Sequence, residues 1–271
     1  MKPEEALRRV IEQFPWKGYV NPARGAHLNV ARTALRFLEP GARILDFGSG
    51  PCDKTAVLQL LGFECSAWDD LQDYWHRLGD NVDKIVAFAR ECGIDFTLAA
   101  DNAFPYQQGS FDMVMLHDVL EHLHDSPREL LNDLLDFVKP EGYLFATVPS
   151  AVNVRKRLAV LFGKTNLPRF DGYYWYPDPW RGHVREYTGD DLNKLSAYLD
   201  LEVLQLSTCD HMLMNLPKVA RPFYRAITRV FTGWKDSWLL VAKKKPNWSP
   251  RRNLPEKELA EVLGAATPYQ Y

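Results

Sequence analysis

The sequence predicts an α/β fold with a doubly wound, mostly parallel sheet of seven strands. Between residues 41 and 150, five short apolar segments alternate with segments of helical period. This alternation is typical of parallel strands whose connecting helices cover both faces of a sheet. Two further apolar segments near the C-terminus supply strands six and seven. With 271 residues, 46% of them hydrophobic and 25% charged, the chain has the balance of a globular protein.

The first 40 residues precede the sheet and are expected to form an N-terminal helical cover. Apolar residues recur at helical spacing around Val10 and around Ala34, and the stretch from Pro15 to Gly25 interrupts the pattern. We therefore expect two helices joined by a loop in this segment.

Residues 41–150 form the predicted core. Its strands and helices are expected at Arg43–Phe47, Asp53–Leu61, Phe63–Trp68, Val82–Cys92, Phe96–Ala99, Met113–His117, Ser126–Val138 and Gly142–Val148, in that order. The helix at Ser126–Val138 has a clear start signal, with Ser126 as the N-cap and Pro127 at the first helical position.

The alternation ends after strand five. Residues 151–187 are too long for an ordinary connection, and we interpret them as a lid insertion. Residues 188–245 complete a single domain that spans residues 1–245. In that part Thr188 and Asp191 mark a helix start, and Leu201–Leu206 and Ser237–Ala242 predict an antiparallel pair of strands. Residues 246–271 are expected to be a polar tail with one short helix at Glu256–Leu263.

A basic amphipathic helix is expected between the last two strands, over residues 217–231. Its basic residues follow one stripe at a spacing of four, and its apolar residues lie elsewhere around the helix. The basic stripe consists of Lys218, Arg221, Arg225 and Arg229. Such a helix can make peripheral contact with an anionic membrane surface. We favour the commoner interpretation, a helix that faces the core and turns its basic side to solvent.

Charge and cysteine content exclude several classes of protein. The net charge of −2 gives no global positive field, so nucleic-acid binding is not favoured. Four cysteines without a CxxC pattern speak against a disulfide scaffold and against a cysteine zinc site. No apolar run reaches 18 residues, and the first residues lack the apolar region of a secretory signal. We therefore expect a cytoplasmic protein.

The turn after the first strand is the most informative segment. It reads Asp46-Phe47-Gly48-Ser49-Gly50-Pro51-Cys52-Asp53 and lies between an expected strand and an expected helix. Its small residues let the backbone pass close under a ligand. A dinucleotide site requires a third glycine where Asp53 stands, and no Gly-Lys-Ser/Thr follows for a P-loop. An acid at Asp46 repels a pyrophosphate but suits a ligand that carries an ammonium group.

This turn resembles the first motif of class I S-adenosylmethionine-dependent methyltransferases, except that Cys52 replaces its third glycine. The resemblance continues in order to about Ser150, through the acid after strand two, the Ala100–Pro105 segment, the fourth strand and the Val138–Leu144 segment. It implies a Rossmann-like fold with S-adenosylmethionine as the cofactor. The implied cofactor-binding residues are Asp46, Gly48, Gly50, Asp69, Asp70, Asp101, Asn102 and His117. Either Asp69 or Asp70 is the expected acceptor of the ribose hydroxyls, and the sequence does not separate the two.

A second resemblance follows the fourth strand. Asp118-Val119-Leu120-Glu121-His122, with the distal His183, resembles the metal-binding E-x-x-E-H pattern of some family members, with Asp118 in place of a glutamate. Those members include methyltransferases of small-RNA 3′ ends and of catechol-like ubiquinone precursors. The implied metal ligands are Asp118, Glu121, His122 and His183, around Mg²⁺ or a transition ion. The alternative is that the glutamate faces the cofactor and the histidine only packs.

The acceptor atom is expected to be oxygen, because a general base or a cation assists the attack of a hydroxyl. The candidate catalytic residues are His183, His122 and Glu121, with His117 as a further base candidate, and His183 is preferred. A structural role of His183 in holding the lid is equally compatible with the sequence. The insertion offers aromatic side chains for a planar acceptor or a sugar, and basic ones for an anionic group.

The sequence thus predicts an S-adenosylmethionine-dependent O-methyltransferase. The expected acceptor is a small molecule, a glycan or a lipid-linked compound. Two alternatives remain: a catalytically silent protein that binds S-adenosylmethionine, and a nicotinamide-dependent enzyme of related fold.

Overall fold

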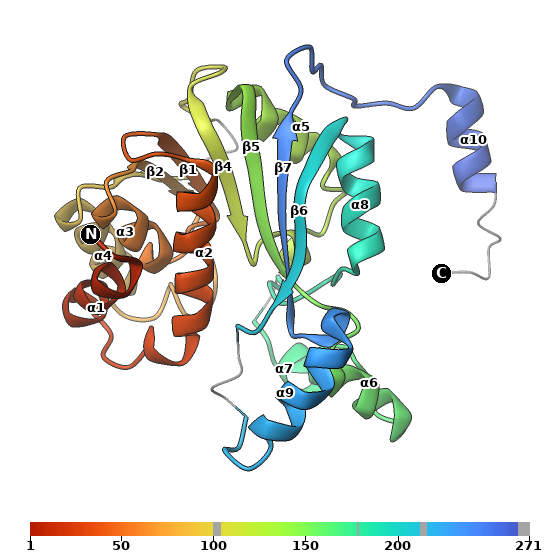
Figure 1. Ribbon diagram of the computed structural model, residues 1–271, viewed down its shortest axis with the longest axis horizontal. Helices are drawn as coiled ribbons and strands as arrows, with labels where there is room; N and C mark the ends of the chain where they lie inside the picture. The colour runs from red at the N-terminus through yellow and green to blue at the C-terminus, as the bar shows by residue number, and fades with distance from the viewer. Residues whose placement is uncertain (100–103, 178, 212–215, 265–271) are drawn as a thin grey trace.

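The structure is a computed structural model that describes residues 1–99, 104–177, 179–211 and 216–264. A seven-stranded sheet runs through the molecule (Figure 1). Its strands are β1 (Arg43–Phe47), β2 (Glu64–Asp69), β3 (Asp95–Leu98), β4 (Phe111–His117), β5 (Val138–Pro149), β6 (Leu201–Cys209) and β7 (Ser237–Lys244). They lie in the order β3-β2-β1-β4-β5-β7-β6. β7 runs antiparallel to both of its neighbours, β5 and β6, and the other pairs of neighbouring strands are parallel. The predicted fold class and the antiparallel pair at the C-terminus are confirmed.

Helices cover both faces of the sheet because side chains alternate along each strand. Ile44 of β1 packs on the side of α1 (Pro3–Gln13), α2 (Arg24–Phe37), α3 (Asp53–Leu60) and α4 (Asn81–Glu91). The next residue, Leu45, packs on the other side with α5 (Arg128–Phe137) and α8 (Gly189–Tyr198). The same alternation separates Met115 from Leu116 in β4. The two buried layers fix the register of the strands that position the site.

The strand order reverses between β1 and β4. β1 pairs with β2 on one side and with β4 on the other, so the chain leaves the ends of these two strands in opposite directions. In open α/β sheets a crevice forms beyond the carboxyl ends of the strands at such a reversal, and ligands bind there. The predicted glycine turn and the Asp118–His122 segment therefore meet at one edge of the sheet.

Element boundaries differ from the expected ones by a few residues. The 3₁₀ turn η1 (Asn21–Ala23) stands between the two N-terminal helices. Pro127 rather than Ser126 takes the N-cap position of α5, because the first helical bond runs from the Leu131 N–H to the Pro127 carbonyl. At α8 the predicted capping box of Thr188 and Asp191 is present. β5 begins four residues early and contains Glu141 at a positive φ of 63°.

Two segments gather beyond the carboxyl ends of the parallel strands, at the lower end of the molecule in Figure 1. Residues 151–187 contain α6 (Val154–Leu161) and α7 (Phe170–Tyr174), which the sequence pattern does not predict. The helix expected at 217–231 is α9 (Arg221–Val230), followed by η4 (Thr232–Trp234). The interpretation of α9 as a core-facing helix is wrong: Phe223 is 74% exposed, and Thr228 is the buried residue of this helix.

The C-terminal residues extend from the far end of the sheet. Trp248 donates from its indole N–H to the Leu199 carbonyl at 2.7 Å, and Arg252 pairs with Glu129 of α5 at 2.7 Å. The last described helix, α10 (Glu256–Gly264), stands away from the sheet (Figure 1). Within the described ranges, every helix is too short or too polar to cross a bilayer.

Candidate active site

A cavity of about 1320 Å³ opens at the carboxyl ends of β1, β2, β4 and β5. Single-ligand sites typically occupy about 300–1,000 Å³, so this cavity has room for two ligands side by side. The loop between α1 and α2, the glycine turn and the segment after β4 form one part of its wall. The 151–187 segment and α9 form the rest, including Arg155, Lys156 and Tyr224.

The glycine turn passes directly along the cavity. Gly48 has a φ of +69°, and a Cβ atom at this position would lie 2.5 Å from Cγ2 of Val119. Gly50 has a φ of +52°. Cys52, which stands where the family motif has its third glycine, adopts a left-handed φ of 61° at the start of α3. The turn therefore keeps a glycine-like backbone although one glycine is replaced.

Asp46 lies behind this turn, and it is buried rather than exposed to the cavity. The Thr55 hydroxyl donates to its Oδ2 at 2.6 Å, while its Oδ1 has no hydrogen-bond partner among the described residues. Burial raises the pKa of Asp46 to about 7, against the lowering effect of the Thr55 hydrogen bond. The carboxyl group thus keeps one oxygen behind the turn that a buried water molecule can satisfy.

The structure gives the two neighbouring acids after β2 different partners. Asp69 accepts hydrogen bonds from the backbone N–H of Gly50 and of Leu71, each at 2.7 Å. Each carboxylate oxygen has a second lone pair, so Asp69 can still accept from two hydroxyl groups in the cavity. Asp70 instead holds Arg181 with both carboxylate oxygens, at 2.8 and 2.7 Å. Both acids line the cavity, and Asp69 is the one whose carboxylate is not bound by Arg181.

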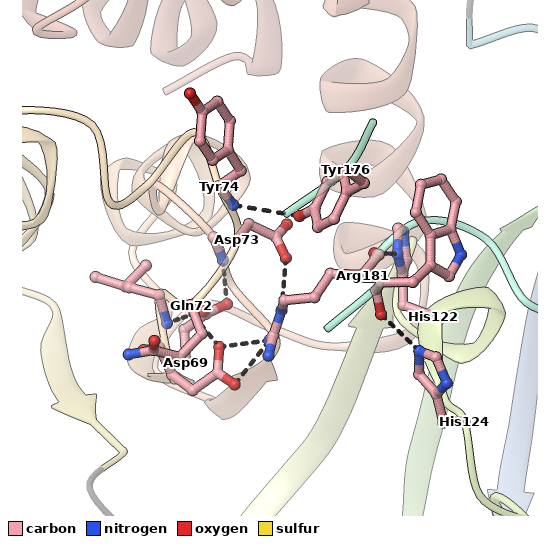
Figure 2. Close-up of polar contacts among 12 residues, drawn as sticks. Asp69, Gln72, Asp73, Tyr74, His122, His124, Tyr176 and Arg181 are labelled. Atoms are coloured by element: carbon pink, nitrogen blue, oxygen red, sulfur yellow. Dashed lines mark hydrogen bonds and ion pairs between the residues drawn. The ribbon is translucent and has the colours of Figure 1, made fainter. Parts of the chain in front are cut away.

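Arg181 fastens the 151–187 segment to the loop after β2. Its Nε donates to Asp73 at 3.0 Å in addition to the two bonds to Asp70, and its main-chain carbonyl accepts from Nδ1 of His122 at 2.6 Å (Figure 2). Nearby, the Tyr74 N–H donates to the Tyr176 hydroxyl at 3.3 Å. The segment is therefore closed over one side of the cavity.

His117, at the end of β4, lines the cavity as a neutral imidazole. Its Nδ1 lies 3.1 Å from the Thr147 hydroxyl, and its Nε2 has no partner among the described residues. Burial, followed by the charge of Lys54, lowers the pKa of His117 to about 3. At neutral pH Nε2 of this ring can form a hydrogen bond with a ligand, but the ring is a weak base.

Glu121, His122 and His183 converge in the same cavity. Nε2 of His122 and Nε2 of His183 each lie 3.9 Å from Oε1 of Glu121. One ligand atom from each of the three residues lies within 4.8 Å of the others. Glu121 and His122 belong to the 3₁₀ turn η2 (Leu120–His122), whereas His183 comes from the 151–187 segment. The Glu121 carbonyl accepts from the Val184 N–H at 2.6 Å, which holds the two segments together.

The remaining nitrogen of each histidine is fixed by an acceptor. Nδ1 of His122 faces the Arg181 carbonyl, and Nδ1 of His183 lies 2.9 Å from Oε1 of Glu186. Glu186 in turn forms an ion pair with Lys156. These acceptors assign the ring protons to Nδ1 and leave the Nε2 lone pairs directed at Glu121, an arrangement typical of metal-ligating histidines.

Burial governs the electrostatics of this cluster, at the acid Glu121 and at the imidazole of His183. Burial, followed by the charge of Asp118, raises the pKa of Glu121 to about 8, and its Oε2 has no partner among the described residues. Burial, followed by His122, lowers the pKa of His183 to about 4. A carboxyl group that is buried without a cation or a donor is costly, so the cluster is suited to hold a positive ion.

The structure does not bring Asp118 into this group. Asp118 has a positive φ of 59°, and its carboxylate pairs with Nζ of Lys54 at 3.3 Å. Burial opposes the charged form of Asp118, but the charges of Lys54, His211 and His117 together outweigh it and lower the pKa of Asp118. Of the four expected metal ligands, three lie together. Asp101 and Asn102, expected at the adenine, lie outside the described residues.

Sequence reasoning missed the roles of Lys54 and Glu186, which line the cavity. Lys54 pairs with Asp118, and Glu186 accepts from His183. Lys156 was expected only among the basic residues offered to an anionic acceptor group, but in the structure it pairs with Glu186. The sequence position of Glu186, three residues after His183, could have identified it as a partner of that histidine. The position of Lys54, directly after the glycine turn, could have placed it near the cavity. Lys156 carries no such signal, since it stands in a run of basic residues.

Comparison with known proteins agrees with this geometry. Residues 23–206 match the protein family described as methyltransferase domain. A ubiquinone biosynthesis O-methyltransferase from Xanthomonas campestris pv. campestris is 27% identical over 197 residues, which cover 72% of this chain and 73% of that protein.

Solved structures share the fold. A SAM-dependent methyltransferase from Aquifex aeolicus has a TM-score of 0.52 at 13% identity, over 90% of this chain and 98% of its own. The [4+2]-cyclase SpnF has a TM-score of 0.54 at 17% identity, over 81% and 82%. The family match spans more than half of the chain and favours a methyltransferase over a nicotinamide-dependent enzyme. The chain therefore belongs to the methyltransferase domain family, and it is a class I S-adenosylmethionine-dependent methyltransferase.

Proposed function

We propose that this methyltransferase transfers the methyl group of S-adenosylmethionine to a hydroxyl oxygen of a small-molecule acceptor, with a divalent transition-metal ion at Glu121, His122 and His183. The observation that carries the proposal is the position of both Nε2 atoms, each 3.9 Å from the same carboxylate oxygen of a buried glutamate in the cavity. The similarity to a protein named as an O-methyltransferase supports oxygen as the acceptor atom.

The cofactor is assigned to the side of the cavity formed by the glycine turn. In this proposal Asp69 accepts the ribose hydroxyls, and Gly48 and Gly50 allow the backbone to approach the ligand. Asp46, with its free Oδ1, faces the ammonium group through a water molecule. The sulfonium carries a positive charge, and the acids Asp46 and Asp69 supply the complementary field. Asp70 acts indirectly, because its carboxylate holds Arg181.

The three converging side chains fit a transition ion better than Mg²⁺. Two imidazoles with one carboxylate are ligands that Zn²⁺, Fe²⁺ and Mn²⁺ accept, whereas Mg²⁺ prefers oxygen ligands throughout. The unpartnered Oε2 of Glu121 and the fixed Nδ1 atoms of both histidines match such a site. A cation held by these residues would polarise an acceptor hydroxyl and lower its pKa, so that its proton could pass to solvent as the oxygen takes the methyl group.

The protein's own contribution is alignment. Transfer from a sulfonium requires the attacking oxygen, the methyl carbon and the sulfur to lie in line, with the sulfur leaving as a thioether. Arg181 and Glu186 fix the two imidazole rings, and Lys156 holds Glu186 in place. Nε2 of His183 cannot serve as a ligand and take up a proton at once. The proposal therefore assigns His183 to the ligand set rather than to proton transfer.

The test is a methylation assay with S-adenosylmethionine labelled in its methyl group and a panel of catechols, phenols, sugars and amines. We expect labelled product from hydroxyl acceptors, identified as a methyl ether by mass spectrometry, together with S-adenosylhomocysteine. Asp69→Ala is expected to lose cofactor affinity, and His183→Ala to lose turnover while it retains cofactor affinity. Transfer only to amines, or full turnover by His183→Ala, would contradict the proposal.

A further inference from the structure

Large apolar side chains gather on two exposed segments beside the cavity. These segments, residues 154–175 with α6 and α7 and residues 217–234 with α9 and η4, are called here the basic apolar surface. More than half of the exposed large hydrophobic side chains of the described residues belong to it. The most exposed are Leu161 (75%), Phe162 (74%), Trp175 (77%), Val219 (80%) and Phe223 (74%). Monomeric soluble proteins rarely expose so many large apolar groups together, so this surface has a partner.

The two segments lie next to each other in the fold. The guanidinium of Arg157 from α6 stands 4.8 Å from the ring centre of Trp234, and Trp234 stacks on Phe231 at 4.4 Å. Figure 1 shows α6, α7 and α9 together beyond the carboxyl ends of the strands. They form one end of the molecule rather than scattered patches.

The basic apolar surface carries a large excess of positive charge. Residues 154–175 contain five Lys or Arg and one acid, Asp171, and residues 217–234 contain four Lys or Arg and no acid, in a chain with a net charge of −2. Arg155, Lys164, Lys218, Arg225 and Arg229 are exposed. A cluster of cations on a slightly acidic protein is complementary to an anionic partner.

The arrangement on α9 is that of an interfacial helix. Phe223, Ile227 and Val230 share one exposed face, and Arg225 and Arg229 lie on the opposite side. The helix is attached to the protein by its flank, where Thr228 is buried and the Tyr224 hydroxyl donates to Asp210 at 2.5 Å. An apolar face directed away from the protein, bordered by long basic side chains, is the pattern of helices that lie in the plane of a bilayer.

We propose that the basic apolar surface docks on a lipid bilayer that contains anionic lipids. The apolar and aromatic side chains enter the headgroup region, where Trp and Tyr are favoured, and the Arg and Lys side chains bind lipid phosphates. A second copy of this chain is a poor occupant, because self-association brings like charges together. A nucleic acid leaves Leu161, Phe162 and Val230 without an apolar partner.

The position of this surface connects docking with the cavity. Arg155 and Lys156 of α6 and Tyr224 of α9 line the cavity, while other residues of the same two helices form the basic apolar surface. A docked protein therefore presents one wall of its cavity to the bilayer. An acceptor dissolved in the membrane reaches the site without crossing bulk water, a consequence that rests on the proposed function.

The experiment is flotation of the full chain with vesicles of phosphatidylcholine, with or without phosphatidylglycerol. We expect the protein to float only with vesicles that contain phosphatidylglycerol, and the bound fraction to fall as salt concentration rises. The double variant Leu161→Ser/Phe223→Ser is expected to weaken binding about tenfold or more, since each loses an apolar anchor. Arg225→Glu/Arg229→Glu is expected to abolish the preference for anionic vesicles.

The matched control variants carry the same kinds of substitution at exposed residues outside the basic apolar surface. Tyr198→Ser/Leu263→Ser removes two exposed apolar groups from α8 and α10, and Arg8→Glu/Arg9→Glu reverses two charges on α1; both are expected to float as the wild type does. Thermal midpoints and affinity for S-adenosylhomocysteine report whether each variant is folded. Quenching of wild-type tryptophan fluorescence by brominated phosphatidylglycerol gives an independent reading that needs no variant.

Several results would overturn the inference. No flotation with anionic vesicles, equal flotation with neutral ones, or an equal loss in the control variants would each do so. A dimer in sedimentation that Leu161→Ser/Phe223→Ser dissociates, without lipid binding, would assign the surface to a second copy. RNA binding lost in Arg225→Glu/Arg229→Glu, again without lipid binding, would assign it to nucleic acid. None of these readings depends on methyl transfer, so failure of the proposed function leaves the inference intact.

Discussion

The main-chain carbonyl of Arg181 accepts a hydrogen bond from Nδ1 of His122 at 2.6 Å, while the side chain of the same arginine binds Asp70. One residue of the 151–187 segment thus contacts both halves of the cavity. Its backbone orients a proposed metal ligand, and its guanidinium holds the loop next to Asp69. Closure of this segment and the shape of the cofactor side are therefore physically connected.

Replacing Arg181 is expected to weaken cofactor binding. Arg181→Ala removes the bonds to Asp70 and Asp73 but keeps the carbonyl that orients His122. We expect affinity for S-adenosylhomocysteine to fall about tenfold, ~1.4 kcal/mol, in calorimetric titration. The matched variant Arg185→Ala, whose guanidinium contacts Asp191 at 3.3 Å, is expected to bind as the wild type does. Equal affinity of Arg181→Ala and wild type would show that the bonds from Arg181 to Asp70 and Asp73 do not affect cofactor binding.

The contact between Gly48 and Val119 predicts a rescue. Gly48→Ala places a Cβ atom 2.5 Å from Cγ2 of Val119 and forces alanine to a φ of +69°, where the backbone penalty alone is about 1–2 kcal/mol. We expect the free energy of unfolding in urea to fall by more than this penalty. Adding Val119→Ala to the Gly48→Ala variant is expected to restore the part of the unfolding free energy that is lost through the clash.

Gly18→Ala serves as the control for that cycle. Gly18 has a φ of +87° and no atom within 4 Å of the added Cβ, so it should show the backbone penalty without a clash. If Gly48→Ala costs no more than Gly18→Ala, the close approach to Val119 has no energetic weight.

The buried pair of Asp53 and His27 predicts a loss of stability in acid. Nε2 of His27 lies 2.6 Å from Oδ2 of Asp53. Burial alone would raise the pKa of Asp53, but the charge and hydrogen bond of His27 outweigh it and lower the pKa to about 2. The unfolded value is about 3.9, so the folded state binds the proton more weakly and the pair contributes on the order of 2–3 kcal/mol above that pH.

This contribution is expected to disappear as the pH falls from about 4 towards about 2. Urea unfolding at a series of pH values measures it. Asp53→Asn should lower the free energy of unfolding at neutral pH and reduce its fall in acid. Asp83→Asn, at an exposed position, should change neither quantity. If Asp53→Asn loses as much unfolding free energy in acid as the wild type does, groups other than Asp53 cause the acid sensitivity.

The convergence of Glu121, His122 and His183 predicts stoichiometric binding of a transition ion. Titration with Mn²⁺ and Zn²⁺ should give one ion per chain, with weaker binding of Mg²⁺. Glu121→Ala, His122→Ala and His183→Ala are each expected to lose at least about tenfold in affinity, and Glu186→Gln about 10–100-fold, because Glu186 fixes the His183 ring.

Asp118→Asn is the matched control for the metal titration. Asp118 was an expected ligand from the sequence, but its carboxylate is held by Lys54. We expect this variant to bind the ion as the wild type does. Loss of the ion in Asp118→Asn with retention in His183→Ala would reverse the assignment.

Local sequence patterns were sufficient to predict the fold. Short apolar segments alternate with helical segments between residues 41 and 150, and this pattern predicts a sheet covered on both faces. In the structure Ile44 and Leu45 pack on opposite faces of that sheet. The glycine turn was recognisable because Gly48 and Gly50 require a backbone that other residues rarely adopt. The capping box at Thr188 is equally local, since both partners lie within one helical turn.

Other features depended on contacts between distant parts of the chain. Asp69 and Asp70 are adjacent acids, and only the approach of Arg181, 111 residues from Asp70, gives them different partners. The position of Asp118 is similarly decided by Lys54. The sequence of residues 217–231 is likewise insufficient to predict which side of the helix is buried. Their periodicity defines two faces, but which face packs depends on the neighbours that the fold brings to it.

The sequence by itself thus determined the order of the seven strands and of the helices that cover them, the turn that resembles a nucleoside-binding motif, and the residue types available for chemistry. The tertiary structure decided which of the two acids binds Arg181, which three side chains converge in the cavity, and which side of α9 is left uncovered. The physical reason is that backbone preference and hydrophobic period act over a few neighbouring residues. The partner of a charged side chain is set by groups that only folding brings within a few ångströms.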